Sequence, residues 1–155
     1  MTLNPGAIFQ NVPLICAVTA WALAQIVKVP LDYFFTREMN WHLLFSAGGM
    51  PSSHSALVVA LGWAIGLEYG FDSSVFAIAF VMGAIVIYDA TGVRRAAGEH
   101  AKVINRMIDD LVEGHPLKDR ELKELLGHTP RQVFVGILFG WVVSGLIWWL
   151  LKRGG

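Results

Sequence analysis

The residues best suited to chemistry gather where apolar segments begin. In "GGMPSSHSALVVALGW", residues 48–63, glycines, a proline and serines surround His54 directly before a long apolar run. Pro51 suits the first turn of a helix, and Ser52 or Ser53 can cap it. Backbone N–H groups at a helix start bind anions, and hydroxyls with an imidazole beside them suit a phosphoryl group. The stretch predicts a phosphate-type anion site, although a helix that is only well capped would use the same residues.

Other polar residues lie at the ends of apolar runs, namely Lys28, Asp89, Arg94, Arg95 and His128. Taken singly, a lysine can snorkel to the membrane edge, and an arginine pair can anchor a helix end. The guanidinium fork also binds phosphate better than an ammonium group does. A carboxylate that faces the bilayer centre costs roughly 2.5–3.5 kcal/mol, so its presence near the end of a span indicates a functional role for Asp89. Because three runs bring Lys, His and Arg to one membrane face, together with a second His, a shared phosphate site is favoured.

The composition indicates that a membrane protein holds these residues. Apolar types make up 55% of the 155 residues and charged types 15%, against roughly 25% charged in an average soluble domain. Runs long enough to span a bilayer, about 20 residues each, occupy about 10–28, 53–70, 74–93 and 131–151. We therefore expect an all-α fold, an integral membrane bundle of four transmembrane helices that forms one domain over residues 1–155.

Several classes of protein are disfavoured by charge and cysteine content. The formal net charge is zero, which gives no electrostatic case for a nucleic-acid partner. The single cysteine, Cys16, lies inside the first run, so neither a disulfide framework nor a cysteine metal site is expected. Residues 1–27 contain no Lys or Arg, so we expect the first run to be a retained helix rather than a cleaved signal. No metal and no cofactor are expected.

The connections between the runs differ in length. "EYGFDSS" predicts a tight hairpin between the second and third runs, whereas 29–52 and 94–130 are long. Apolar residues in 99–126 recur at helical spacing, which predicts an amphipathic surface helix between the third and fourth spans. Ten of the twelve Lys and Arg residues lie in the long connections or directly beside them, at Lys28 and Arg131. The positive-inside rule therefore places the connection 94–130 and the active-site face in the cytoplasm, in a cell inner or plasma membrane.

These motifs resemble the type 2 phosphatidic acid phosphatase superfamily, which includes vanadium haloperoxidases, and in particular its short, divergent branch. The run 51–54 is similar to the family's Pro-Ser-Gly-His motif, with Ser53 in place of Gly. The run that begins at His128 is similar to the end of the third motif, with Gln132 where the family has Asp. The first motif is represented by Lys28, which lacks the Arg-Pro that follows in the family.

The arginine of the third motif is best matched by Arg94 or Arg95. His100 keeps the family's five-residue gap from Arg94 and is therefore a rival to His128. However, it begins the amphipathic helix and has Ile104, rather than Asp, at the orienting position. We favour His128.

The resemblance implies metal-independent hydrolysis of a phosphomonoester or diphosphate. His128 would be the nucleophile that becomes phosphorylated, and His54 would protonate the leaving oxygen. Gln132 would orient His128, with Asp89 or Glu124 supplying negative charge. The phosphoryl oxygens would be held by Lys28, Ser52, Ser53, Arg94 and Arg95. The cytoplasmic orientation favours a phospholipid phosphate substrate, phosphatidylglycerophosphate or phosphatidate, and the small bundle suggests a homodimer.

Two other hypotheses remain open. A non-catalytic membrane protein that binds anionic lipid headgroups, or a partner membrane protein, would explain the split third motif and Gln132 better. The pairs Gly62/Gly66 and Gly136/Gly140 suit close helix contacts of that kind. A metal-dependent transferase using Asp89 with Glu124 is less favoured, because no carboxylate cluster shares one helix face.

Overall fold

The protein is a bundle of long helices. The computed structural model describes residues 5–46, 48–92, 100–101, 103–105, 107–108 and 128–153. Its long helices are α1 (Val12–Thr36), α2 (Ser53–Tyr69), α3 (Ser74–Thr91) and α5 (Pro130–Arg153), and its short 3-10 helices are η1 (Pro5–Gln10) and η2 (Trp41–Leu44). No strand occurs among the described residues, so the all-α prediction is confirmed.

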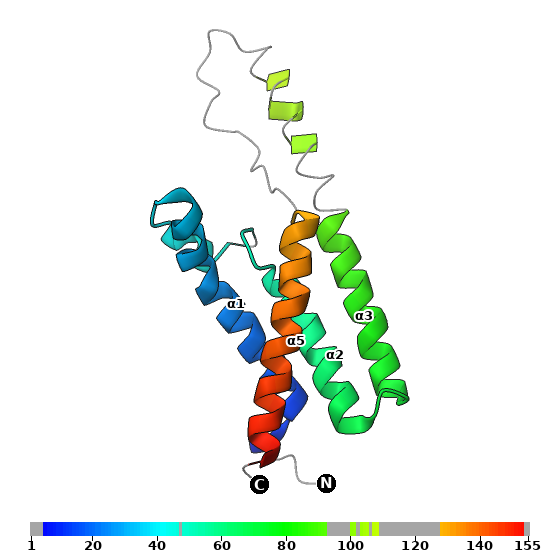
Figure 1. Ribbon diagram of the computed structural model, residues 1–155. Coiled ribbons are helices and arrows are strands. Elements are labelled where there is room, and N and C mark those ends of the chain that lie inside the picture. Colours follow the sequence, from blue (N-terminus) through cyan, green and yellow to red (C-terminus); the bar gives the residue numbers. More distant parts are fainter. Residues whose placement is uncertain are drawn as a thin grey trace.

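The helix α2 lies at the centre of the bundle. It packs against α1, α3 and α5, while α3 lies mainly against α2. The chain runs up and down, so both termini lie at one end and the starts of α2 and α5 lie toward the other (Figure 1). That second end, where α1 and α3 also finish, carries the predicted site residues and is called the site end below.

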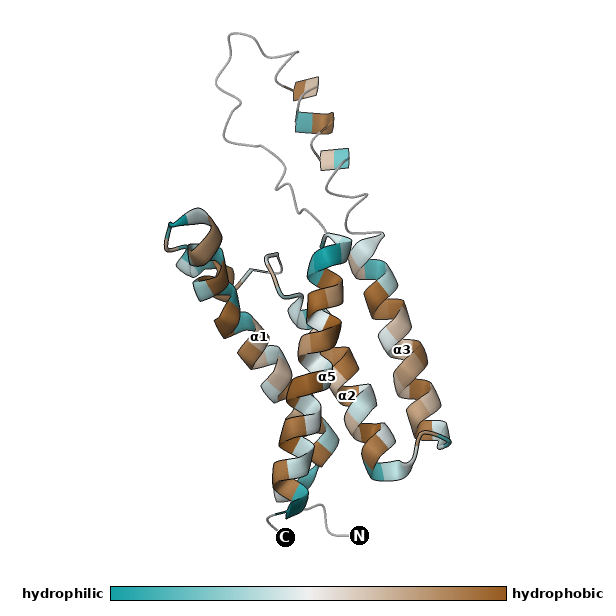
Figure 2. Cartoon of the chain, in the orientation of Figure 1, coloured by the Kyte–Doolittle hydropathy of each residue, from teal (hydrophilic) through white to brown (hydrophobic). Residues whose placement is uncertain are grey.

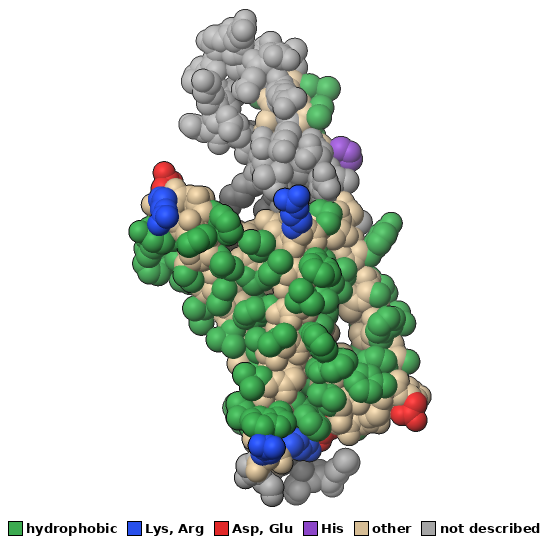
Figure 3. All heavy atoms as spheres, viewed as in Figure 1, with side chains coloured by type: hydrophobic (Ala, Val, Ile, Leu, Met, Phe, Trp, Pro, Cys, Tyr) green, Lys and Arg blue, Asp and Glu red, His purple; other side chains and the backbone are tan. Residues whose placement is uncertain are grey.

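The exterior of the bundle is apolar along most of its length. Figure 2 shows hydrophobic residues along the helices, and Figure 3 shows charged side chains confined to the two ends of the visible face. Within the described part of the chain, α1, α3 and α5 are long and apolar enough to cross a membrane. The 17-residue α2 is not among them, so the count of four spans stays a prediction.

Small residues allow the helices to approach closely. The fully buried positions are mostly Ala, Ser and Cys on α1, α2 and α5. A Cβ added at Gly136 would meet the carbonyl oxygen of Ser52, and one at Gly140 would meet that of Ala56. Such contacts between backbones are typical of helices packed in a membrane, where a hydrophobic driving force between helices is absent.

Side-chain caps define where the helices begin. Ser52 and Ser73 accept hydrogen bonds from the backbone N–H groups three residues later, which starts α2 and α3. Gly70 ends α2 with a φ of 91°, a conformation that glycine adopts without strain. The predicted hairpin between the second and third runs is therefore present.

The first helix is longer at its carboxyl end than the sequence suggested. We expected the run to close at Lys28, but α1 continues through Pro30 to Thr36 and ends at Arg37. The run was expected to end there because a lysine normally seeks the membrane edge. In the structure this lysine is buried between helices, so it does not mark the surface.

Candidate functional site

The starts of α2 and α5 are held together at the site end. The backbone N–H of Ser52 donates to the carbonyl oxygen of Gln132 at 3.1 Å, which joins the two helix starts directly. Gly136 allows this approach, because any larger residue would push against Ser52. Two helix N-termini therefore lie side by side, and each favours negative charge nearby.

This arrangement brings the two predicted histidines together. The ring centroids of His54 and His128 are 6.4 Å apart, and the ring planes are inclined at 57°. His128 is 5% exposed, and its backbone N–H donates to the carbonyl oxygen of Ala90 at 3.2 Å, which also ties the end of α3 to this position. Two imidazoles from distant parts of the sequence can thus reach one ligand.

Gln132 has a double role at the start of α5. Its Oε1 accepts the backbone N–H of Thr129 at 2.9 Å, and its own N–H donates to the Thr129 hydroxyl at 3.4 Å, which together make a capping box. The same Oε1 lies 3.4 Å from Nδ1 of His128. The side chain that caps the helix is therefore also the neighbour that can orient the imidazole.

Lys28 is the buried cation of the site end. It is 1% exposed, and its Nζ donates to the carbonyl oxygen of Ser46 at 3.0 Å and to Oγ of Ser53 at 3.5 Å. Both acceptors are neutral. A buried charge is costly unless it is paired, so the ammonium group favours an anion beside it.

A small polar pocket lies next to this lysine. It has a volume of about 130 Å³ and is lined by Lys28, Asp32, Gln132, Gly49 and a few apolar side chains. Ligand sites for larger molecules measure roughly 300–1,000 Å³. By volume the pocket suits a group of about the size of phosphate, but the carboxylate of Asp32 is part of its lining and neither histidine is.

Sequence reasoning missed Asp32, which is half-buried and lines this pocket. Its spacing of four residues from Lys28 places both on one face of a helix, and that spacing was the available signal. Asp32 was not predicted as a site residue because the helix was expected to end at Lys28. The carbonyl oxygen of Ser46 was also missed, since any residue type can supply a backbone acceptor.

The remaining predicted residues are only partly described. Asp89 is half-buried in the last turn of α3, next to Ala90. His100 lies exposed in a helical stretch that covers the described positions between 100 and 108. Arg94, Arg95, Glu124 and most of the predicted amphipathic helix lie outside the described residues. Among the residues that are described, no group of three or more His, Cys, Asp or Glu could hold a metal ion.

An apolar helical bundle with a buried lysine, a capping serine and paired histidines at one end agrees with a PAP2-like membrane protein, and the comparisons with known proteins show that family. The chain belongs to the Divergent PAP2 family, whose model matches residues 9–143. It is 44% identical over 144 residues to the "Uncharacterized membrane protein YuiD" of Bacillus subtilis (strain 168), with 86% of this chain and 91% of the relative covered. No solved structure matches the chain. Its place in a membrane agrees with this relative and with the three long apolar helices.

Proposed function

We propose that the chain is a membrane lipid phosphate phosphatase that hydrolyses a phosphomonoester through a phosphohistidine intermediate, without a metal ion. The observation that carries the proposal is the position of Lys28. Its buried ammonium group donates to Ser53, and the next residue along α2 is His54, whose ring lies against His128. A cation, two hydroxyl-bearing residues at a helix start and two imidazoles are the groups that phosphoryl transfer requires.

His128 is the proposed nucleophile. With Nδ1–H donating to Oε1 of Gln132, the lone pair lies on Nε2 of the neutral imidazole. Nε2 attacks phosphorus, an N–P bond forms, and the bond from phosphorus to the ester oxygen breaks. His54 donates a proton to that oxygen, which leaves as the hydroxyl of the dephosphorylated lipid.

Water completes the cycle. It attacks the phosphorus of phosphohistidine while His54, now neutral, accepts a proton from the water, and inorganic phosphate leaves with His128 restored. Charge on the transferred group is stabilised by Lys28 and by the backbone N–H groups at the start of α2, with Ser52, Ser53, Arg94 and Arg95 as further proposed phosphate ligands. Asp89 and Glu124 are proposed to offset the positive charge on phosphohistidine, which Gln132 cannot do.

The pocket next to Lys28 supports a phosphomonoester by its size alone, because neither His54 nor His128 is among the residues that line it. A volume of about 130 Å³ holds a terminal phosphate and leaves the glycerol and acyl parts of a lipid outside. Phosphatidylglycerophosphate and phosphatidate both carry such a phosphate, and both fit a site that faces the cytoplasm. A diphosphate such as that of undecaprenyl diphosphate is less favoured.

The direct test is phosphate release by purified protein from a panel of lipid phosphates in detergent micelles. We expect release in the presence of a chelator, and its loss in both His54→Ala and His128→Ala. His100→Ala is the matched control and should keep full activity. Full activity in either variant of the histidine pair would contradict the mechanism.

The cytoplasmic orientation has its own test. Both termini lie at the end of the bundle opposite the site (Figure 1). An alkaline phosphatase reporter, which is active only outside the cytoplasm, should therefore be active when fused to the C-terminus. A silent reporter, together with a fluorescent protein that is bright at the same position, would reverse the orientation and the choice of substrate leaflet.

We also propose that the protein works as a homodimer, because four helices provide few walls for a lipid headgroup. Light scattering of the purified protein in detergent should give a protein mass of two chains. A protein mass of one chain in a preparation that releases phosphate would contradict the dimer.

Gln132 favours one alternative, a non-catalytic protein that binds anionic lipid headgroups, because a carboxylate is absent where the family has Asp. That alternative predicts no phosphate release by the wild-type chain. It also predicts binding to vesicles that contain phosphatidate, and loss of that binding in Lys28→Met.

A further inference from the structure

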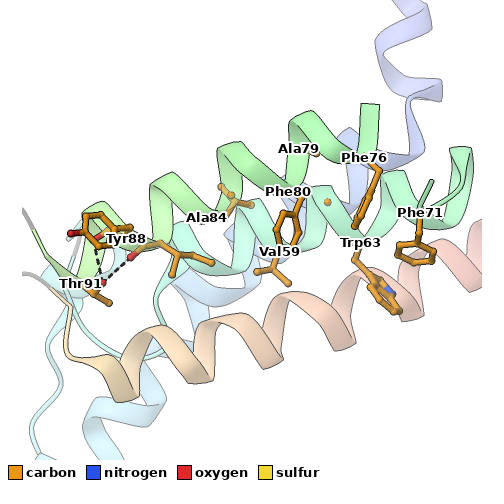
Figure 4. Close-up of a pocket in the computed structure, with 13 residues that line it drawn as sticks. Val59, Trp63, Phe71, Phe76, Ala79, Phe80, Ala84, Tyr88 and Thr91 are labelled. Carbon is orange, nitrogen blue, oxygen red and sulfur yellow. Dashed lines mark hydrogen bonds between the residues drawn. The ribbon is translucent and has the colours of Figure 1, made fainter. Parts of the chain in front are cut away.

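An apolar groove runs between α2 and α3 (Figure 4). Its volume is about 670 Å³. The wall from α3 extends from Phe76 to Thr91, a rise of about 22 Å at 1.5 Å per residue. That length exceeds half of the roughly 30 Å hydrocarbon core of a bilayer. The hydroxyl of Thr91 hydrogen-bonds to carbonyl oxygens of its own helix, so the groove presents almost only carbon.

A missing side chain on α2 keeps the groove open. A Cβ added at Gly62 would meet no atom within 4 Å, and one at Gly83 across the groove would make only ordinary contact with Val58. Gly136 and Gly140 differ, because a backbone oxygen blocks each of them. Gly62 therefore leaves space along the helix surface, whereas the glycines of α5 allow close packing.

The groove runs toward the histidine pair, although neither histidine is among the residues that line it. His54, Val58 and Gly62 follow one another at four-residue spacing, so His54 lies on the helix face that lines the groove. On α3, Thr91 is adjacent to Ala90, whose carbonyl oxygen accepts the backbone N–H of His128. An occupant that extends beyond the Thr91 end of the groove would thus approach both imidazoles.

The other end of the groove is closed by aromatic rings. The ring of Phe71 lies 5.2 Å from that of Trp63 and 5.1 Å from that of Phe76, measured between centroids. Figure 4 shows these three side chains gathered at the end remote from Tyr88 and Thr91. The groove is therefore bounded by aromatic rings at the end remote from the histidine pair.

We propose that this groove binds a hydrocarbon chain of the lipid whose phosphate lies between His54 and His128. The inference rests on the proposed function. It adds a hydrocarbon chain of the lipid to the parts of the substrate that the protein binds. A chain is as well solvated by the bilayer as by the protein, so the groove acts by fit and position rather than by hydrophobic transfer. Holding the chain beside α2 presents the phosphate to the two imidazoles.

The substitution Gly62→Leu tests the groove with little risk to folding. Leucine forms helices better than glycine does, and its Cβ would meet no atom within 4 Å at a position that lines the groove. We expect phosphate release from a lipid phosphate with 16-carbon chains to fall on the order of tenfold, as for pockets that change by a few methylene groups. Release from a water-soluble analogue with short chains should not change.

The matched control is Ala77→Leu, which adds the same side chain to an exposed position of α3 outside the groove. It should leave both activities unchanged. Equal loss on the long-chain and short-chain substrates in Gly62→Leu, or no loss on either, would overturn the proposal.

A second measurement does not depend on turnover, so it separates failure of the groove from failure of the proposed function. Protein in vesicles is photolysed with a phospholipid that carries a diazirine in its acyl chain, and the adducts are located by mass spectrometry. We expect adducts at Val59, Phe80 and Ala84, reduced several-fold by Gly62→Leu but not by Ala77→Leu. Adducts spread evenly over α1 and α5, or unchanged in Gly62→Leu, would refute chain binding. Efficient disulfide-linked dimers of Phe80→Cys would assign the groove to a second copy of the chain instead.

Discussion

The rings of His54 and His128 lie 6.4 Å apart at an angle of 57°, although one residue starts α2 and the other precedes α5. Their separation is set by backbone contacts. The backbone N–H of Ser52 donates to the carbonyl oxygen of Gln132 at 3.1 Å, and Gly136 permits that approach. The two imidazoles are therefore fixed by the packing of the helices. A phosphoryl group between them would lie at two helix N-termini, where an anion is favoured.

The proposed division of labour between the two histidines predicts different responses to the leaving group. A good leaving group such as nitrophenolate needs no proton, so on an aryl phosphate His54→Ala should lose little of the first step, the formation of phosphohistidine. On an alkyl phosphate, loss of a general acid should cost about 10²–10⁴-fold. His128→Ala should be inactive on both substrates, because the nucleophile is gone. Because hydrolysis of phosphohistidine also uses His54, the first step is measured as the initial burst of released phenol or alcohol from each substrate. Equal losses of this burst in His54→Ala would contradict the assignment of His54 as proton donor.

Lys28 should be important for activity and not for folding. Lys28→Met keeps the length of the side chain and removes a buried charge whose two acceptors are neutral, so it also removes a desolvation cost. A hydrogen bond to a charged group contributes about 1.5–3 kcal/mol. The kcat/KM for phosphate release should therefore fall by roughly 10–100-fold. The melting temperature in detergent should stay equal or rise. A fall in melting temperature with unchanged kcat/KM would show that the lysine is structural.

The sequence predicts the helices and the paired histidines well, for a physical reason. Apolar runs of membrane length, capping serines and a glycine stop are local signals, and they locate the hairpin and the start of α2. The positions of His54 and His128 next to helix starts follow from the same signals. The approach of the two histidines depends on Gly136. The sequence alone does not show that a glycine is required there, because the requirement comes from the backbone of Ser52 packed against it.

Other features could not be read from the pattern. The burial of Lys28 depends on the path of the connection after α1, which returns the carbonyl oxygen of Ser46 to the ammonium group. Gly62 and Gly66 matched a helix-contact pattern, but Gly62 faces open space and Gly66 is covered by Phe71. The pattern of small residues is the same whether a helix, a ring or a groove lies opposite, so only the packing distinguishes them.

Gly62 of α2 and Gly140 of α5 should respond in opposite ways to the same substitution. Gly140→Ala places a Cβ against the backbone oxygen of Ala56, which cannot swing aside, and overpacking of this kind costs about 1–3 kcal/mol. Gly62→Ala meets nothing and should stabilise the helix by up to about 1 kcal/mol. Melting temperatures of the two variants in one detergent test this. A similar shift in both would mean that α2 and α5 do not pack as closely as described.

Gln132 allows the roles of cap and orienting group to be separated. Gln132→Glu keeps an oxygen for the backbone N–H of Thr129, preserves the capping box and adds negative charge beside Nδ1 of His128. Stability should therefore be maintained, and phosphate release should rise, because a carboxylate stabilises cationic phosphohistidine better than an amide does. Gln132→Leu should lose activity and also about 0.5–2 kcal/mol of stability through the lost cap. If Gln132→Glu keeps its melting temperature but releases phosphate more slowly than the wild type, the amide is required in its own right, and the proposed use of negative charge at His128 is wrong.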